Sequence, residues 1–378
     1  FIEAAVLSGY NIIGFDKNKS PYCIEQCNHF YKVAIDNKCE IKRILSKFKD
    51  VIGCISEQTD SGLETVGYIN SFLGLRGPSE IITSDLRNKY LQRQTAEAFG
   101  IEQPKFLLYC DNPMFSTDFK NMFSNVDSVI VKPTVGQSSI GIFEFKVEEV
   151  LRKININEDP FFEIAKQFGT ILVEEKLEGK DVSIDGFVSG GQISIALICD
   201  KFKNKRNKFV DQLLIGSRYS YLDHVNEKMF VEQLVGAHNI DDCFFHIEVK
   251  RYANKIKLIE WTCRGGGSGV SSIMASNVLG LDYAKIRINL LEGSIPLQMI
   301  SANQIIGVML FFDNHARPDQ TELLDLEKKS VFWEYSNIPN ATKGPSTGVR
   351  DGRDRKSKLI ACFQTAQFKN EHIEIKLL

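Results

Sequence analysis

Residues 244–269 read FFHIEVKRYANKIKLIEWTCRGGGSG, two runs in which apolar and polar residues alternate, joined by a turn near Asn254. Alternation of this kind is typical of β-strands with one buried face, so the stretch predicts a β-hairpin. If the turn centres on Asn254, Glu248 lies opposite Glu260 and His246 lies opposite Thr262. All four side chains then share one face of the hairpin.

Two carboxylates directly across a strand pair repel one another. A divalent cation between them removes the repulsion, and carboxylate oxygens are the ligands that Mg²⁺ prefers. The sequence therefore predicts a metal site at Glu248 and Glu260. The alternative is a shifted register that leaves two carboxylates in solvent.

The residues after the second run favour an anion site beside this metal. Arg264 continues the face of Glu260 and Thr262, and a guanidinium can hold a planar oxyanion with two hydrogen bonds. The glycine-rich run 265–269 lets backbone N–H groups approach an anion closely. A flexible linker is the alternative interpretation.

A second segment, VIVKPTVGQSSIG at residues 129–141, predicts a strand, a loop of small residues and a returning strand. Lys132 stands at the strand end as a charge for phosphate, and the loop supplies backbone donors and hydroxyls. The P-loop pattern GxxxxGK[ST] is absent. Taken alone, such a loop is more often an ordinary turn.

A third segment, LVEEKLEGKDVSIDG at residues 172–186, predicts a strand that leaves through a short linker and returns as another strand. The backbone of such a linker can bind an adenine edge, and Asp181 can accept ribose hydroxyls. An acidic loop that is simply solvated is the alternative.

Together, in this order, the three segments resemble the ATP-grasp superfamily over about residues 85–295, and most nearly its carboxylate–amine ligases. The likeness to biotin carboxylase and carbamoyl-phosphate synthase is more distant. The resemblance implies an α/β fold, made of α+β subdomains that enclose ATP, preceded by a Rossmann-like pre-ATP-grasp domain. It also implies ATP and Mg²⁺ as cofactors, with Mn²⁺ able to replace Mg²⁺.

Carried over residue by residue, the resemblance assigns the following roles. Lys89 and Lys132 contact the phosphates and the adenine side of ATP, and Ser138 and Ser139 lie in the phosphate-covering loop. The adenine linker contains Glu174, Glu175 and Leu177, and Asp181 binds the ribose. Glu248 and Glu260 bind Mg²⁺, and Arg264 steadies the acyl phosphate. Lys201, in the basic run KFKNKRNK at 201–208, is expected to reach phosphate. Thr262 is expected as the third metal residue, where the family pattern Glu-x-Asn-x-Arg has asparagine. Its hydroxyl is a poorer ligand than an amide carbonyl, so either Thr262 binds the metal through water or a second Mg²⁺ is held less tightly.

The function that this resemblance implies is an ATP-dependent ligase that joins a small carboxylic acid to an amine and releases ADP and phosphate. One alternative is an enzyme that phosphorylates bicarbonate, like biotin carboxylase or carbamoyl-phosphate synthase. A non-catalytic nucleotide-binding protein is another, favoured by Thr262. Lids over the site are expected at 134–141 and 201–208.

Composition narrows the class of protein. The formal net charge of −2 over 378 residues gives no basic field for nucleic acid, and no apolar run is long enough to span a membrane. Nine scattered cysteines favour reduced thiols in a cytoplasmic protein. A homodimer is the default among soluble oligomers.

The expected domains are a Rossmann-like domain at 1–84, a first ATP-grasp subdomain at 85–175, a second with the metal site at 176–300, and a C-terminal segment at 301–378. The C-terminal segment is expected to complete the substrate side, with Arg350, Asp351, Arg353 and Asp354 in a closing loop. In the first domain we expect parallel strands at Asn11–Phe15 and Val51–Ile55, preceded by a strand before residue 1, since the chain opens inside a helix without an initiator methionine. Ser84 to Phe99 reads as one helix, with Ser84 as its N-cap and Lys89 inside it.

Overall fold

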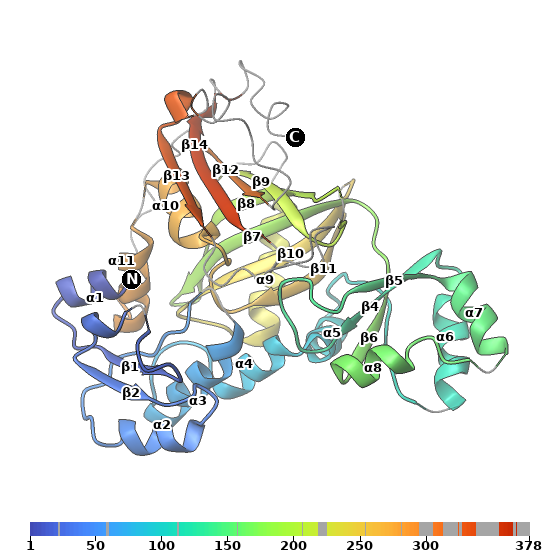
Figure 1. Ribbon diagram of the computed structural model, residues 1–378, viewed down its shortest axis with the longest axis horizontal. Helices are drawn as coiled ribbons and strands as arrows, with labels where there is room; N and C mark the ends of the chain where they lie inside the picture. Colours follow the sequence, from blue (N-terminus) through green and yellow to red (C-terminus); the bar gives the residue numbers. More distant parts are fainter. Residues whose placement is uncertain are drawn as a thin grey trace.

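The computed structural model describes residues 1–378 except 22, 58–59, 112, 157, 206, 218–224, 254, 281, 295–304, 313–323, 325–326, 338–354, 366–367 and 369–378. Three sheets organise the described residues: a parallel pair, a four-stranded sheet and an eight-stranded sheet. Figure 1 shows the eight-stranded sheet in the middle, with the N-terminal part on one side and the four-stranded sheet on the other. The residues Arg350, Asp351, Arg353 and Asp354 lie outside the described part.

The N-terminal part holds the parallel pair β1 (Ile13–Asp16) and β2 (His29–Lys32). Around this pair are α1 (Ile2–Leu7), η1 (Ile24–Gln26), α2 (Lys38–Leu45), η2 (Asp60–Gly62) and α3 (Leu63–Leu73). The predicted parallel sheet is confirmed, but one of its expected strands is wrong. Val51–Ile55 forms no strand, and β2 takes its place in the pairing. The apolar side chains of Val51 and Cys54 pack on the core of this part. The apolar residues of Val51–Ile55 therefore indicate burial and not pairing with another strand.

The predicted single helix from Ser84 to Phe99 is two helices, α4 (Glu80–Arg87) and α5 (Lys89–Ala98). Asn88 separates them: its backbone is extended, and its side chain accepts a hydrogen bond from Tyr90 N. An asparagine that caps a new helix ends the previous one. Lys89 is therefore the first residue of α5, at the end nearest the phosphate loop.

The four-stranded sheet has the order β3-β6-β4-β5 and is antiparallel throughout. Its strands are β3 (Phe106–Leu108), β4 (Ser128–Pro133), β5 (Phe143–Lys146) and β6 (Ile171–Glu175), with α6 (Pro113–Phe123), α7 (Val147–Asn155) and α8 (Phe162–Phe168). The strand and returning strand predicted from the segment 129–141 are β4 and β5, which pair as a hairpin. Aromatic side chains of Phe115, Phe119 and Phe161 fill the core between sheet and helices.

The eight-stranded sheet has the order β11-β10-β7-β8-β9-β12-β14-β13. Its strands are β7 (Lys180–Ser189), β8 (Gln192–Lys203), β9 (Asp211–Ser217), β10 (Cys243–Tyr252), β11 (Lys255–Thr262), β12 (Ile305–Phe312), β13 (Phe332–Asn337) and β14 (Ser357–Gln364), and its helices are α9 (Val225–His238), η3 (Val270–Ala275), α10 (Ser276–Leu279) and α11 (Tyr283–Glu292). The turn between β7 and β8 consists of Gly190 and Gly191, both at positive φ, where glycine avoids a steric penalty.

Strands from beyond residue 300 belong to the same sheet as the predicted metal hairpin, and α4 runs across the expected boundary at residue 84. The four domain boundaries stay predictions. No helix in the described part of the chain is long and apolar enough to cross a bilayer. All nine cysteines are free thiols.

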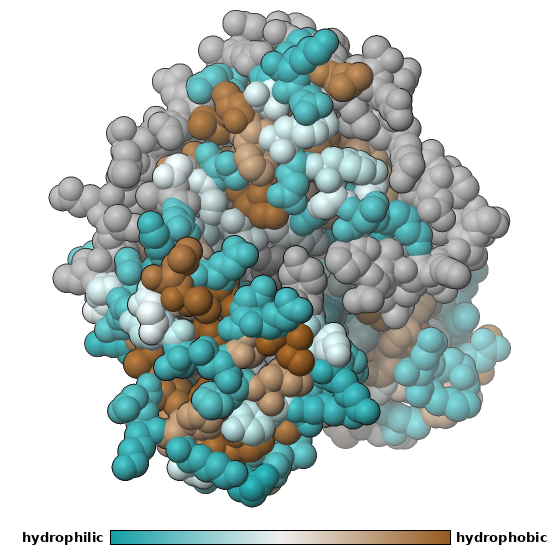
Figure 2. Space-filling model, turned by 60° about the vertical axis from the view of Figure 1, so that its left-hand side comes forward, coloured by the Kyte–Doolittle hydropathy of each residue, from teal (hydrophilic) through white to brown (hydrophobic). Residues whose placement is uncertain are grey.

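Figure 2 brings the N-terminal side of the molecule forward and shows hydrophobic patches set among hydrophilic side chains. Val6 and Leu7 of α1 are exposed apolar residues, at 45% and 88%. The homodimer expectation stays a prediction.

Candidate active site

The two carboxylates of the β10–β11 hairpin lie opposite one another, as predicted. Glu248 pairs with Glu260, and His246 pairs with Thr262. Between the turn and the site, the pairing of β10 with β11 differs by one position from the pairing at Glu248 and Glu260. Ile259, the extra residue of a β-bulge in β11, accounts for this shift. Without the bulge, Glu260 would face the other side of the sheet.

Helix α5 holds this bulged edge strand in place. The Arg93 guanidinium donates to the Ile259 carbonyl at 2.5 Å. The Gln92 side chain makes two 3.1 Å hydrogen bonds with the backbone N–H and carbonyl of Trp261. An edge strand leaves backbone groups unpaired, and these two side chains satisfy those beside the acidic pair.

Each carboxylate of the pair contacts a lysine. Lys201 Nζ lies 2.7 Å from Glu248 Oε1 and 2.9 Å from Asp211 Oδ2, and Lys89 Nζ lies 2.9 Å from Glu260 Oε2. Burial opposes ionisation of Glu248, but the charges of Lys201 and His246 outweigh it and hold the pKa of Glu248 well below its usual range. These contacts use one oxygen of each glutamate, so the acidic pair is already a site that attracts cations.

Glu174 lies buried between two cations. Its Oε1 accepts from Arg93 Nε and its Oε2 from Lys132 Nζ, both at 2.7 Å. Burial alone would raise the pKa of Glu174, yet the charges of Arg93 and Lys132 lower it. Burial lowers the pKa of Lys132, and Glu174 offsets part of that effect. Both carboxylate oxygens of Glu174 are therefore engaged in orienting Lys132 and Arg93.

A cavity of about 330 Å³ lies between the two larger sheets, within the size range of small-molecule sites. Its lining includes these predicted site residues: Lys89, Lys132, Ser139, Glu174, Glu175, Leu177, Asp181, Glu248 and Glu260. Four predicted residues are not in the lining that the described residues form: Ser138, Lys201, Thr262 and Arg264. The structure thus brings residues from all three sequence segments to one cavity.

Two loops meet above this cavity. Ser139 Oγ, in the loop between β4 and β5, donates to the Phe209 carbonyl at 2.7 Å. Glu144 accepts from Lys208 at 2.5 Å and from Lys176 at 3.2 Å. The predicted lid at 134–141 therefore contacts Phe209, one residue beyond the predicted lid at 201–208, and Lys208 of that second lid contacts Glu144 on β5.

Asp181, predicted at the ribose, lies at the cavity edge beside lysines. Its Oδ2 lies 2.8 Å from Lys250 Nζ, and its Oδ1 lies 3.8 Å from Lys203 Nζ. Glu175 accepts from the backbone N–H of Lys105 at 3.2 Å. The acidic side chain of Asp181 is thus already paired, so a ribose hydroxyl there would share it with a lysine.

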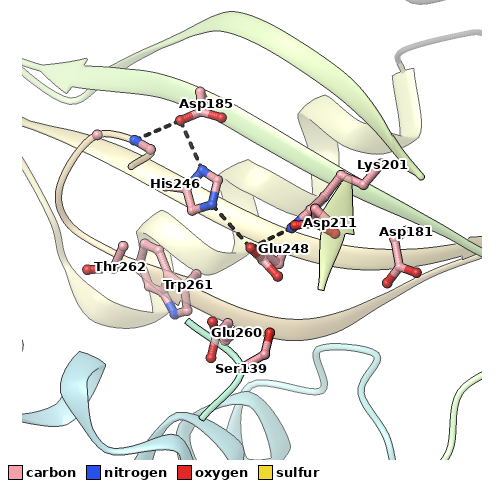
Figure 3. Close-up of polar contacts among 12 residues, drawn as sticks. Ser139, Asp181, Asp185, Lys201, Asp211, His246, Glu248, Glu260, Trp261 and Thr262 are labelled. Atoms are coloured by element: carbon pink, nitrogen blue, oxygen red, sulfur yellow. Dashed lines mark hydrogen bonds and ion pairs between the residues drawn. The ribbon is translucent and has the colours of Figure 1, made fainter. Parts of the chain in front are cut away.

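A partly buried chain of polar groups leads from Glu248 to the glycine run (Figure 3). His246 Nε2 lies 3.4 Å from Glu248 Oε1, and His246 Nδ1 lies 3.0 Å from Asp185 Oδ1, which also accepts from Gly266 N. Burial alone would lower the pKa of His246, but the carboxylates of Asp185 and Glu248 raise it to about 9. The sequence interpretation placed His246 on this face and missed Asp185, although Asp185 alternates in phase with Asp181 on β7.

Arg264 and Thr262 share a partner that the sequence interpretation also missed. Asp60 Oδ1 accepts from Arg264 Nε and Asp60 Oδ2 accepts from Arg264 Nη2, both at 2.7 Å. The Thr262 hydroxyl donates to Asp60 Oδ1 at 3.2 Å. Burial opposes ionisation of Asp60, but Arg264 lowers its pKa overall. The only hint in the sequence was the acidic stretch after Val51–Ile55.

The described residues contain no group of three or more His, Cys, Asp or Glu side chains arranged to hold a metal ion. The acidic pair provides two carboxylates, and Thr262 on the same face provides a hydroxyl. Any metal bound here therefore needs oxygen atoms from nucleotide or water to complete its coordination.

Comparison with known proteins matches a domain to the part of the chain that holds all three sequence segments of the site. Residues 126–272 match the family described as ATP-grasp domain. No protein with a curated description matches the chain in sequence.

Solved structures resemble the whole chain at low identity. L-amino acid ligase from Bacillus licheniformis has a TM-score of 0.74 at 16% identity, covering 100% of this chain and 93% of that one. N5-carboxyaminoimidazole synthetase from Staphylococcus aureus, complexed with ADP, has a TM-score of 0.72 at 14% identity, with the same coverage. Phosphoribosylglycinamide synthetase from Anaerococcus prevotii has a TM-score of 0.71 at 17% identity, covering 99% of this chain and 93% of that one.

Residues 126–272 thus match an ATP-grasp domain, and the fold of the chain is mixed α/β, with an N-terminal parallel sheet and antiparallel sheets after it, like that of the L-amino acid ligase.

Proposed function

We propose that this protein is an ATP-dependent ligase that activates a carboxylate as an acyl phosphate and couples it to an amine, releasing ADP and phosphate. The observation that carries the proposal is the pair Glu248 and Glu260, opposite one another at a cavity that Lys89 and Lys132 also line. Paired carboxylates beside two lysines suit a metal-bound triphosphate, whose negative charge needs cations on several sides.

In the proposed complex the triphosphate lies against Lys132 and Lys89. Glu174 holds the Lys132 ammonium in place at 2.7 Å, which preserves a charge that burial would otherwise weaken. Lys89 already bridges Glu260 and the Gly136 carbonyl, each at 2.9 Å. It therefore joins the acidic pair to the phosphate-covering loop that contains Ser138 and Ser139.

The adenine is proposed to bind along the linker after β6. Glu175 and Leu177 line the cavity and would present backbone groups to the base, with Asp181 next to the ribose. The role proposed for Glu174 changes from contact with the base to orientation of Lys132, because both of its carboxylate oxygens are engaged.

Glu248 and Glu260 would hold Mg²⁺, or Mn²⁺ in its place. The donor set fits a hard cation, because the carboxylates face one another and each already attracts an ammonium group. When bound, the metal would neutralise charge on the phosphates. Lys201, paired with Glu248 and Asp211 and absent from the cavity lining, is proposed to orient Glu248 and not to touch phosphate.

The chemistry proceeds by two displacements. A carboxylate oxygen attacks the γ-phosphorus, the bond to the bridging oxygen breaks, and ADP leaves with the electron pair. The nitrogen of the neutral amine then forms a bond to the carbonyl carbon, phosphate leaves with the C–O electrons, and the nitrogen gives up one proton, which the released phosphate takes up. Arg264 is proposed to steady the acyl phosphate, and the two touching loops keep water away from it.

The test incubates the protein with ATP, Mg²⁺ and pooled amino acids and follows the nucleotide products. We expect ADP and phosphate, together with a hydroxamate when hydroxylamine is added to trap the acyl phosphate. Formation of AMP and pyrophosphate would contradict the proposal. Bicarbonate-dependent ADP release without any organic acid would replace it with bicarbonate phosphorylation, and nucleotide binding without turnover would leave a non-catalytic protein.

A further inference from the structure

Asp60 connects the N-terminal part to the metal end of the site. It is the first residue of η2, and its carboxylate receives both Arg264 and the Thr262 hydroxyl. Its own backbone N–H points to Gln137 Oε1, in the phosphate-covering loop, at 3.4 Å. One residue therefore contacts two parts of the site that are far apart in the sequence, the segment 262–264 and the loop that contains Gln137.

The contact with Asp60 determines what the Thr262 oxygen can still bind. A hydroxyl has one proton and two lone pairs. Thr262 gives its proton to Asp60, so only lone pairs remain for any further partner. That partner must be a cation or a hydrogen-bond donor such as a metal-bound water.

The position of Thr262 matches this requirement. It lies on the face of the hairpin that carries Glu248 and Glu260, directly opposite His246. A neutral hydroxyl is a weak ligand, but a hydrogen bond to a carboxylate increases the electron density on its oxygen. The Thr262 oxygen is thus oriented to bind a cation or to accept a hydrogen bond from a metal-bound water.

Asp60 leaves a defined part of Arg264 available as well. The guanidinium has five N–H groups. Nε and Nη2 each donate to Asp60, and Nη1 donates to the Gly265 carbonyl at 2.8 Å. The other two N–H groups, one on each terminal nitrogen, have no hydrogen-bond partner in the part of the chain that the structure describes, and the Asp60 contact sets their direction.

We propose that Asp60 is a positioning residue that makes Thr262 an oxygen ligand of the metal site, directly or through a bound water, and orients Arg264 at the same time. The inference rests on the proposed nucleotide and metal site. It explains how threonine can stand where the ATP-grasp pattern has asparagine: the amide oxygen needs no proton acceptor, whereas the hydroxyl does.

The test measures Mn²⁺ binding in the presence of ADP by electron paramagnetic resonance, which needs no knowledge of the acid or amine. Asp60→Asn is expected to weaken Mn²⁺ binding about tenfold to a hundredfold, the range for partners of metal ligands. Thr262→Asn is expected to remove this dependence, so that Asp60→Asn has little effect in the Thr262→Asn background. Asp242→Asn is the matched control, because it breaks a 2.7 Å pair with Arg76 outside the site.

If Asp60→Asn weakens Mn²⁺ binding equally in both backgrounds, the inference is overturned. Such a result would mean that Asp60 acts only through its negative charge, which does not depend on the residue at position 262. If Thr262→Asn does not fold, Thr262→Val replaces it, and the double variant with Asp60→Asn should bind no more weakly than either single variant. Additive losses would again overturn the inference. A parent protein that binds no Mn²⁺ with ADP overturns the proposed site itself, and with it the role of Asp60.

Discussion

Glu248 and Glu260 face each other because one extra residue in β11, Ile259, corrects the register between the turn and the site. Arg93 binds the carbonyl of that extra residue, and it also binds Glu174 in the neighbouring sheet. The acidic pair is therefore built by the hairpin and held by a helix from outside it.

Glu260→Gln tests whether the acidic pair is needed for catalysis. The change removes one charge from the proposed metal site while keeping the side-chain shape, so ATP-dependent product formation should fall about a hundredfold or more. Far-ultraviolet circular dichroism should show an intact fold, because the side chain is 36% exposed. Glu163→Gln, on the surface of α8, is the control. Unchanged function in the Glu260→Gln protein would favour a non-catalytic role.

Glu174→Gln tests the buried pairing with Arg93 and Lys132. Removing the charge leaves two buried cations without their partner, which should lower the free energy of unfolding by about 3–5 kcal/mol. Urea unfolding measures this change. Glu148→Gln breaks an exposed pair with Arg152 on α7 and should cost less than about 1 kcal/mol. Similar losses in the free energy of unfolding for the two variants would show that the buried pairing of Glu174 does not stabilise the fold more than a surface ion pair does.

Glu144→Gln tests the contact that fixes the loop between β8 and β9 over the cavity. The variant weakens the contact of Glu144, on β5, with Lys208 of that loop and with Lys176 of the linker after β6, so a fluorescent ADP analogue should bind and leave faster in stopped-flow measurements. Asp127→Asn is the control, because Asp127 pairs with Lys146 at an exposed position of the same sheet. Exchange rates equal to those of the parent protein would mean that the loops open without breaking this contact.

Cysteine labelling tests burial of the sheet that continues beyond residue 300. Burial raises the pKa of Cys362, on β14, to about 12. At pH 8 about one such thiol in 10⁴ is ionised, so Cys362 should resist alkylation in the folded protein while the exposed Cys39 and Cys110 react. Adding urea should remove the protection.

The raised pKa of Cys362 also predicts how the free energy of unfolding changes with pH. The unfolded state releases the Cys362 proton near the ordinary pKa of a thiol, whereas the folded state keeps it until about pH 12. The stability that this thiol contributes is present below about pH 8.5 and is lost as the pH rises toward 12. Rapid labelling of Cys362 at pH 8 without denaturant would contradict its buried position.

Local patterns in the sequence determined the hairpins, the order of the three site segments and the face shared by Glu248 and Glu260. Alternation works for such elements because burial of one face is imposed on neighbouring residues of the same strand. The same logic failed for Val51–Ile55, whose apolar residues are buried without a partner strand, and for Asn88, whose cap divides a helical pattern.

Only the tertiary structure decided which distant groups complete the site. Asp60 and Arg264 lie 204 positions apart, and Arg93 and Ile259 lie 166 apart. No periodic pattern links such residues, because their contact depends on how separate elements pack and not on the conformation of either one. The bulge at Ile259, the double pairing of Glu174 and the hydroxyl geometry of Thr262 all follow from that packing.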